Sequence, residues 1–308
     1  MIKLGLVALI AIAMTSCGDK GDAQEIIELK TDKDSLSYIL GAEQAKFILE
    51  KGDPNLQKLD FDEMAAGFET AILDKQEQMD QACQDALEKL YGRDGKDYDS
   101  TYRKQGSHCI GGIAGSIFYH VWNSKGVLKD VNIKIARAGF RHALLQQDTL
   151  INDERRNQIA SDFISGVNKK SGSALMAKAN KLSNIQVIEG GIVIETIKAG
   201  SGPNPAPNSD VEVDYILTNS FGDTVENSFY MRQQTQQGVP AFNLTGVIPG
   251  WGAAFPKLQK GGKYNLYIPW EMAYGLQHQC ETLKFYVELN NFGPQGTLAK
   301  MPEQAAPY

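Results

Sequence analysis

Two periodicities divide the chain near residue 183. Between about residues 30 and 182, apolar residues recur three and four positions apart, which is the spacing of one face of an α-helix. Beyond residue 183, apolar and polar residues alternate as they do in half-buried β-strands. The pattern predicts an α+β protein with an all-helical N-terminal region and a β-rich C-terminal region.

The first helices have recognisable boundaries. Asp34 or Ser35 is predicted to cap a first helix that ends at Gly52–Asn55. Asp60 begins a second helix, with Glu63 three residues later in the arrangement of a capping box. The predicted apolar stripes are Leu36, Ile39, Leu40, Phe47 and Ile48 in the first helix, and Phe61, Met64, Ala65, Phe68 and Ile72 in the second, continuing through Met79, Cys83, Leu87 and Leu90.

A helical unit recurs about seventy residues further along the chain. Gly41–Ala45 is matched by Gly111–Gly115, and Ala66–Ile72 is matched by Ala138–Leu144. The second pair shares the pattern A-G-F-x-x-A-[IL], which favours duplication over chance. Small residues at matching positions indicate closely packed helices rather than a ligand site.

Strand candidates and loops follow. The predicted strands are Ile192–Ile197, Val211–Leu217, Tyr264–Ile268 and Leu283–Leu289. Gly200–Asn208 is predicted to be a loop, and residues 294–308, rich in Gly, Pro, Gln and Ala, a flexible tail. A polar loop is predicted over residues 92–107.

The amino-acid composition argues against some classes of function. The 308 residues carry a formal charge of -6 and no run of Lys or Arg, which argues against nucleic-acid binding. The four cysteines show no C-x-x-C spacing and the four histidines no H-x-x-x-H spacing, so we expect neither a metal site nor a cofactor.

The first residues indicate export. Lys3 precedes an apolar run, Leu4–Met14, that is too short to span a bilayer permanently. Met14-Thr15-Ser16-Cys17 resembles the lipobox of bacterial lipoproteins, which implies cleavage before Cys17 and lipidation of its thiol. An ordinary secretory signal and an uncleaved anchor are the alternatives. Gly18 after the cysteine favours the outer membrane over the inner one.

Export permits a disulfide. Cys83 and Cys109 flank the polar loop and are the favoured pair, which leaves Cys280 free once Cys17 is lipidated. Three unpaired thiols are the alternative.

The C-terminal half contains four motifs in order: Val247-Ile248-Pro249-Gly250-Trp251, Gly261-Gly262-Lys263, Ile268–Gly275 with the pattern I-P-x-x-x-A-Y-G, and Thr282–Leu289 with T-L-x-F-x-V-E-L. Together they resemble the FK506-binding-protein (FKBP) type of peptidyl-prolyl cis–trans isomerase over about residues 184–292. The resemblance implies an antiparallel β-sheet wrapped on a short helix and an apolar pocket that catalyses rotation about Xaa-Pro bonds.

The resemblance also assigns site residues. Trp251 would form the pocket floor, and Tyr215, Phe242 and Phe285 would form its walls. Val247 and Ile248 would line the side, with the Ile248 amide meeting the substrate carbonyl. Tyr274 would donate its hydroxyl to the substrate backbone, and Glu226 would stand in place of the family's aspartate. The alternative for each of these side chains is ordinary core packing.

The chain departs from the family pattern at three places. The family's F-D-S-S segment reads Val225-Glu226-Asn227-Ser228, which replaces an aromatic wall by valine. The following segment, up to Phe242, is longer than usual and includes the polar run Arg232–Gln237. Leu276–Glu281 replaces a longer loop that closes over the substrate, so we expect a more open pocket.

The helical half resembles the N-terminal domain of macrophage-infectivity-potentiator-type FKBPs, which dimerise through one such unit per chain. Two units in one chain imply either a homodimer or an intrachain pseudo-dimer. The predicted organisation is a signal peptide at 1–16, a lipidated Cys and tether at 17–29, a helical domain at 30–183 with repeats at about 34–91 and 108–170, an FKBP-type domain at 184–293 and a tail at 294–308.

Two functions compete. The first is an exported, lipid-anchored isomerase that acts on unfolded, proline-containing polypeptides of the cell envelope. The second is a catalytically weak or inactive FKBP module that acts as a chaperone or binds a fixed partner. A purely structural role has no positive feature beyond the large helical half.

Overall fold

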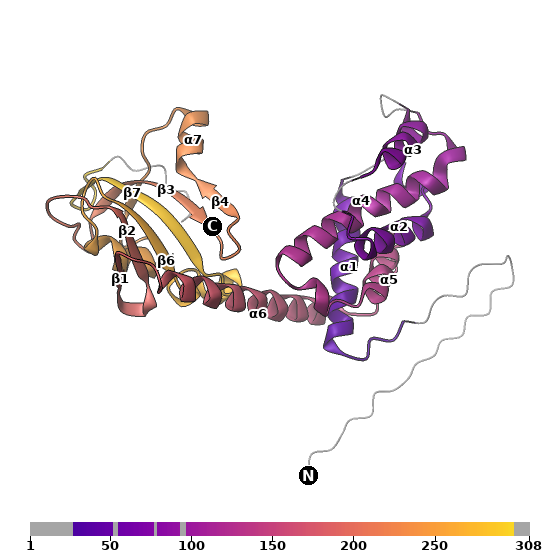
Figure 1. Cartoon of the computed structure of the whole chain (residues 1–308), viewed down its shortest axis with the longest axis horizontal. Helices are drawn as coiled ribbons and strands as arrows, with labels where there is room; N and C mark the ends of the chain where they lie inside the picture. The colour runs from indigo at the N-terminus through magenta and orange to yellow at the C-terminus, as the bar shows by residue number, and fades with distance from the viewer. Residues whose placement is uncertain (1–26, 52–54, 77–78, 93–96, 299–308) are drawn as a thin grey trace, which may run out of the picture.

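The protein consists of a helical lobe and a β-rich lobe joined by one long helix (Figure 1). The computed structural model describes residues 27–51, 55–76, 79–92 and 97–298. The predicted signal peptide, Cys17 and the end of the predicted tail lie outside these residues. Within them, no helix is both long and apolar enough to cross a membrane.

In the described part of the N-terminal half, the chain forms six α-helices. They are α1 (Asp32–Glu50), α2 (Phe61–Leu73), α3 (Gln81–Tyr91), α4 (Arg103–Ser124), α5 (Ile133–Leu144) and α6 (Asp153–Ala179). Short 3₁₀ turns at Leu56–Lys58, Ser100–Tyr102 and Leu128–Asp130 connect them. With 27 residues, α6 is about 40 Å long and carries the chain from one lobe to the other.

The helix starts differ in part from those predicted. Thr31 caps α1, and Asp34 is the third residue of a reciprocal capping box, so neither Asp34 nor Ser35 is the cap. Asp60 caps α2 as predicted by accepting a hydrogen bond from the Glu63 amide.

The stripe after Ile72 and the polar loop are also corrected. The second helix ends at Leu73, and a separate α3 begins after its cap Asp80, whose carboxylate accepts from the Cys83 amide. Residues 103–107 belong to α4 rather than to the loop. The predicted disulfide is confirmed, because Cys83 on α3 is bonded to Cys109 on α4, whereas Cys280 is buried and free.

The two repeats exchange partners within the chain. The main neighbour of α1 is α5, and that of α2 is α4, so each repeat packs its first helix on the second helix of the other. Equivalent contacts recur on both sides: the Ser37 hydroxyl accepts from the Asn132 amide, and the Ser107 hydroxyl accepts from the Asp60 amide, each at 2.9 Å. Phe68 and Phe140, which are equivalent residues, stack at the centre with ring centroids 4.4 Å apart.

Glycines permit these crossings. A Cβ added at Gly41 would lie 1.8 Å from the Ala136 carbonyl oxygen, and one at Gly111 would lie 1.8 Å from the Met64 carbonyl oxygen. The recurring glycines therefore serve close backbone packing.

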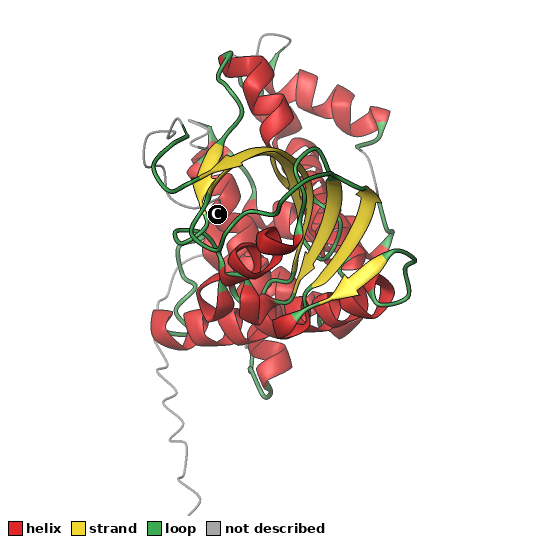
Figure 2. Ribbon diagram, turned by 90° about the vertical axis from the view of Figure 1, so that its left-hand side faces the viewer, coloured by secondary structure: helices red, strands yellow, loops and turns green. Residues whose placement is uncertain are grey.

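The β-rich lobe is a seven-stranded antiparallel sheet curved around a short helix (Figure 2). Its strand order is β1-β2-β6-β7-β3-β4, with β5 also paired to β3. The elements are β1 (Ile185–Val187), β2 (Val193–Lys198), β3 (Asp210–Thr218), β4 (Thr224–Asn227), α7 (Ser228–Thr235), β5 (Ala241–Asn243), α8 (Pro249–Ala254), β6 (Lys263–Ile268) and β7 (Leu283–Gly293). Residues predicted to face inward on β3 and β7, including Tyr215 and Phe285, form the core together with α8.

Helix α7 occupies the longer segment that was predicted only as a polar run. Nη1 of Arg232 donates to both carboxylate oxygens of the buried Asp214, at 2.7 Å each. The Ser228 hydroxyl donates to the same carboxylate. Tertiary contacts therefore hold this helix against β3.

Residues 294–298, predicted to begin a flexible tail, return instead to the sheet. The Asp210 carboxylate accepts from the Gly296 amide at 2.7 Å and from the Asn243 side chain at 2.7 Å. Although desolvation raises the pKa of Asp210, these hydrogen bonds lower it by more and hold it below its usual range.

Candidate functional site

An aromatic cluster at the centre of the β-rich lobe surrounds Trp251. The ring centroids of Phe285, Phe242 and Tyr215 lie 5.2, 5.4 and 5.6 Å from that of the indole, all in edge-on arrangements. Trp251 is 2% exposed, and within the described chain its Nε1 has no hydrogen-bond partner. The indole is therefore held by packing alone.

Local structure explains how these rings meet. Tyr215 and Phe285 lie on the neighbouring strands β3 and β7, on the face that covers α8. Pro249 at the first position of α8 fixes the start of the helix that carries Trp251. A Cβ at Gly250 would lie 2.4 Å from the Ile268 side chain, so a glycine there lets α8 approach the sheet closely.

All eight residues assigned to the pocket are gathered around this cluster. Tyr215, Ile248, Trp251 and Phe285 are buried in it, and Phe242, Val247 and Tyr274 pack against it while remaining partly exposed. Glu226 on β4 joins them through its carboxylate, which accepts from the Tyr215 hydroxyl at 2.6 Å.

Glu226 also sets the electrostatics. Burial and the Glu226 carboxylate together raise the pKa of Tyr274 to about 12. Burial, the hydrogen bond to Glu226 and its charge raise the pKa of Tyr215 well above the ordinary value. Both phenols are therefore protonated at neutral pH and can donate hydrogen bonds.

Two donors at the cluster are free among the described residues. The Tyr274 hydroxyl makes no hydrogen bond to them, and neither does the Ile248 amide, which precedes α8. In contrast, the Tyr215 hydroxyl is already committed to Glu226. The site thus combines an apolar aromatic floor with two donors available to a bound amide.

Two of the departures from the family pattern place apolar side chains at the surface. Val225, at the position where the resemblance implies an aromatic wall, is 48% exposed. The short connection before β7 forms a 3₁₀ turn at Gly275–His278, and Leu276 at its tip is 75% exposed.

Sequence reasoning missed two contributors. Phe255 is fully buried, and its ring centroid lies 4.9 Å from that of Trp251, nearer than any assigned wall. Its position four residues after Trp251, one helical turn away, was the available signal. Ser228 is buried, and its hydroxyl accepts from the Tyr215 amide at 2.8 Å, which fixes β3 beneath the ring.

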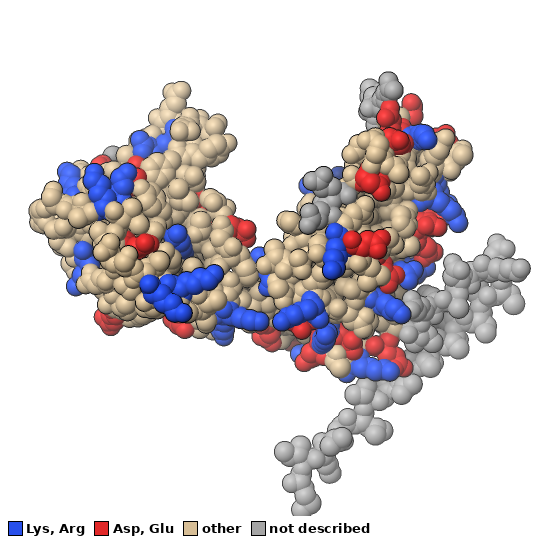
Figure 3. Space-filling view, viewed as in Figure 1, with Lys and Arg blue, Asp and Glu red and all other residues tan. Residues whose placement is uncertain are grey.

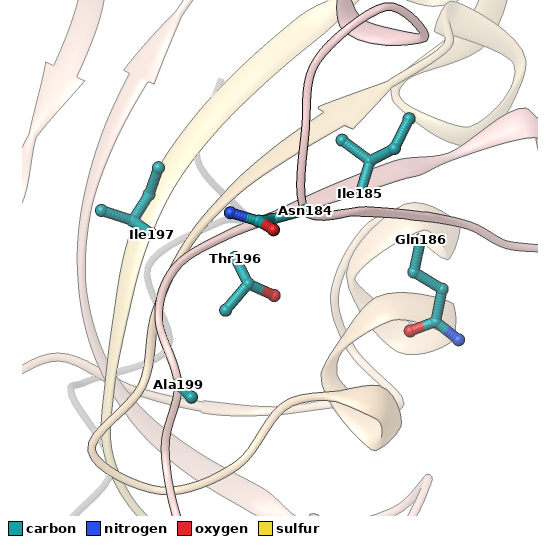
Figure 4. Close-up of a pocket in the computed structure, with 6 residues that line it drawn as sticks. All are labelled: Asn184, Ile185, Gln186, Thr196, Ile197 and Ala199. Carbon is teal, nitrogen blue, oxygen red and sulfur yellow. The ribbon is translucent and has the colours of Figure 1, made fainter.

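A separate hollow of about 490 Å³ lies where β1 meets β2 (Figure 4). Its lining residues are Asn184, Ile185, Gln186, Thr196, Ile197 and Ala199, and none of them belongs to the aromatic cluster. The lining contains no ionisable group, so it offers no acid–base chemistry. Among the described residues, no group of three or more His, Cys, Asp or Glu side chains could hold a metal ion.

Comparison with known proteins gives one consistent result. Residues 202–290 match the family described as FKBP-type peptidyl-prolyl cis-trans isomerase. The chain is 33% identical over 145 residues to the FKBP-type peptidyl-prolyl cis-trans isomerase FkpA of Escherichia coli K12, covering 45% of this chain and 52% of FkpA. It is 37% identical over 84 residues to a probable FK506-binding protein of Corynebacterium glutamicum, covering 27% and 68%.

A third relative shares a longer segment. The outer membrane protein MIP of Legionella longbeachae is 24% identical over 184 residues, which cover 55% of this chain and 74% of MIP. The chain spans about half the length of the FkpA relatives it matches.

Proposed function

Because the chain belongs to the family of FKBP-type peptidyl-prolyl cis–trans isomerases, we propose that it catalyses rotation about Xaa-Pro bonds in unfolded polypeptides. The observation that carries this proposal is the aromatic cluster around Trp251, which borders two unused hydrogen-bond donors. The proline ring would rest on the indole between Tyr215, Phe242 and Phe285.

The reaction needs no nucleophile, because no covalent bond is made or broken. The barrier of about 18–20 kcal/mol comes from amide resonance, which is lost when the bond is twisted. A dry aromatic surface disfavours the polar planar amide more than the less polar twisted one, which lowers the barrier. The Ile248 amide would hold the carbonyl before proline, and the Tyr274 hydroxyl would hold the backbone beyond it.

A second function has its own support. Val225 and Leu276 are exposed apolar side chains at two departures from the family pattern, and much of the surface visible beside the space between the two lobes carries no Lys, Arg, Asp or Glu (Figure 3). Such surfaces suit an unfolded client chain held without turnover. A chaperone with weak or absent isomerase activity is therefore the alternative.

Cis–trans exchange in a short Xaa-Pro peptide, measured by NMR, separates these functions. The wild type should accelerate exchange, and Trp251→Ala should abolish the acceleration. Because this truncation removes a buried ring at a cost of about 3–5 kcal/mol, Tyr274→Phe is the second variant, expected to slow turnover about tenfold through one lost hydrogen bond.

Tyr230→Phe is the matched control, since Tyr230 is 60% exposed on α7. A wild type that leaves exchange unchanged, yet suppresses aggregation of a proline-free client, would replace the isomerase by the chaperone. Equal turnover in the wild type and a folded Trp251→Ala would place the chemistry elsewhere.

We also propose that the protein is exported and anchored by a lipid on Cys17. The sequence Met14-Thr15-Ser16-Cys17 supports this, and a relative named as an outer membrane protein agrees with an envelope location. Metabolic labelling with a fatty acid should mark the wild type but not Cys17→Ser, and labelling of both would refute the anchor.

We further propose that the helical lobe completes its own dimer-like core within one chain. The exchange of partners between α1–α5 and α2–α4 supports this, because both halves of each contact come from the same chain.

A further inference from the structure

Helix α6 is fastened to the β-rich lobe by specific contacts. Asn168, 8% exposed, donates from Nδ2 to the Gln279 carbonyl oxygen at 3.0 Å. One turn further, the Ser171 hydroxyl donates to the Ser220 carbonyl oxygen at 3.1 Å. The helix is therefore part of this lobe as well as a connection to it.

The contact from Asn168 falls on a loop with an unfavourable backbone. Gln279 and Cys280 have φ values of 50° and 60°, in the left-handed region that side chains other than glycine rarely adopt. Inside the loop the Cys280 amide donates to the Gly275 carbonyl oxygen at 3.1 Å. Surrounding contacts must hold such a conformation, and Asn168 supplies one from outside the loop.

This loop begins at the candidate site. Gly275 directly follows Tyr274, and the His278 ring lies 4.6 Å from the Tyr274 ring by centroids. Tyr274 in turn packs against the cluster around Trp251. Gln279 is thus connected to the phenol of Tyr274 through this short turn.

We infer that α6 positions the loop 275–281, and through it Tyr274, so that Asn168 of the interlobe helix is a positioning residue of the proline site. This inference rests on the proposed isomerase function. It gives the shortened loop a support from outside the isomerase sheet.

Two glycines of α6 provide a matched pair of variants. A Cβ at Gly172 would lie 2.2 Å from Thr282 Oγ1 and 2.7 Å from its Cβ, and Thr282 is buried at the end of the same loop. A Cβ at Gly166 would have nothing within 4 Å. Gly172→Ala therefore wedges the helix from the loop, while Gly166→Ala makes the same chemical change without contact.

Peptide turnover should separate the two variants. We expect Gly172→Ala to lower kcat/KM about tenfold, because small displacements of a binding group are costly, and Gly166→Ala to match the wild type. Asn168→Ala should raise KM more than it lowers kcat. Ser171→Ala, which removes the hydrogen bond to the Ser220 carbonyl oxygen outside loop 275–281, should change neither KM nor kcat.

Amide NMR spectra give the readout that a loss of folding would not mimic. Apart from the neighbours of residue 168 in α6, the shifts in Asn168→Ala should be confined to residues 274–282. Equal turnover in Gly172→Ala, Asn168→Ala and the wild type would overturn the inference while leaving the isomerase intact. Absence of turnover in the wild type would instead overturn the proposed function.

Discussion

Glu226 interacts with two phenols of the candidate site, Tyr215 and Tyr274. Its carboxylate accepts from Tyr215 at 2.6 Å and lies close enough to Tyr274 to raise the pKa of that phenol. The Glu226 side chain, which is longer than the family's aspartate, therefore still reaches Tyr215 on β3. Burial and, to a smaller extent, the charge of Glu226 raise the pKa of both phenols, which suits donors rather than proton carriers.

The pH dependence follows from these shifts. A free tyrosine ionises near pH 10, whereas Tyr274 should ionise near pH 12. We expect turnover to show no loss from phenol ionisation up to about pH 10. Tyrosinate absorbance, compared between the wild type and Tyr274→Phe, measures the ionisation directly, and Glu226→Gln should move it to lower pH. An ionisation of Tyr274 near pH 10 would contradict this account.

The raised pKa values of Tyr215 and Tyr274 also make the stability of the fold depend on pH. Because the folded state binds the phenol protons more tightly than the unfolded state, their contribution is complete below about pH 10. The contribution of Tyr274 to stability is lost as the pH rises from there towards 12.

For individual residues, the order of the motifs in the sequence predicted the aromatic cluster, since Trp251, Tyr215 and Phe285 meet as expected. It missed Phe255, which lies outside the quoted motifs and meets the indole only because α8 continues into a 3₁₀ turn. Ser228 was also missed, because its hydrogen bond to the Tyr215 amide depends on how β4 ends.

Among the elements, the crossing of α2 and α4 depends on one glycine of an adjacent pair. A Cβ at Gly111 would lie 1.8 Å from the Met64 carbonyl oxygen, whereas a Cβ at Gly112 would have its nearest neighbour at 3.9 Å. Neither glycine has a positive φ, so steric contact alone distinguishes them.

Alanine at these two positions should therefore have opposite effects. We expect Gly111→Ala to destabilise the helical lobe by about 3 kcal/mol or more through overpacking. Gly112→Ala should gain about 0.5–1 kcal/mol from helix propensity. Chemical denaturation followed by circular dichroism measures both, and equal stabilities would show that the backbones do not touch at Gly111.

Helix periodicity predicted α1, α2 and the repeated unit because most of their apolar residues are buried, although Phe47 of the predicted first stripe is 50% exposed. It could not predict α7, which has few apolar residues and is held by the pair Arg232–Asp214, distant in sequence. The boundary at Arg103 was missed for a related reason: the first turn of α4 is polar, and Gly106 in it packs against Leu90 of α3.

For the whole molecule, the exchanged helices predict the assembly state. Both helix pairs that bury the cores of the two repeats lie within one chain. We expect a soluble form lacking the first 29 residues to be monomeric, with the mass of one chain in light scattering across a tenfold range of concentration. A mass of two chains would show that the repeats pair between molecules.

The relative placement of the lobes was beyond the sequence analysis. Asn168, Ser171 and Lys125 contact loops of the β-rich lobe, and the Lys125 ammonium lies 4.0 Å from the Phe221 ring centroid. These are single contacts between distant segments, and no periodicity marks them.

The crossed pairing of the repeats also dictates the order in which the chain can fold. The main partner of α1, which contacts it at Gly41, is α5, and Ala136 of α5 lies almost a hundred residues later in the sequence. Contacts that join such distant segments form slowly, because a long loop must close before they stabilise anything. As the polypeptide emerges from a ribosome or a translocation channel, the first repeat must wait, unfolded and open to proteases, until the second has appeared.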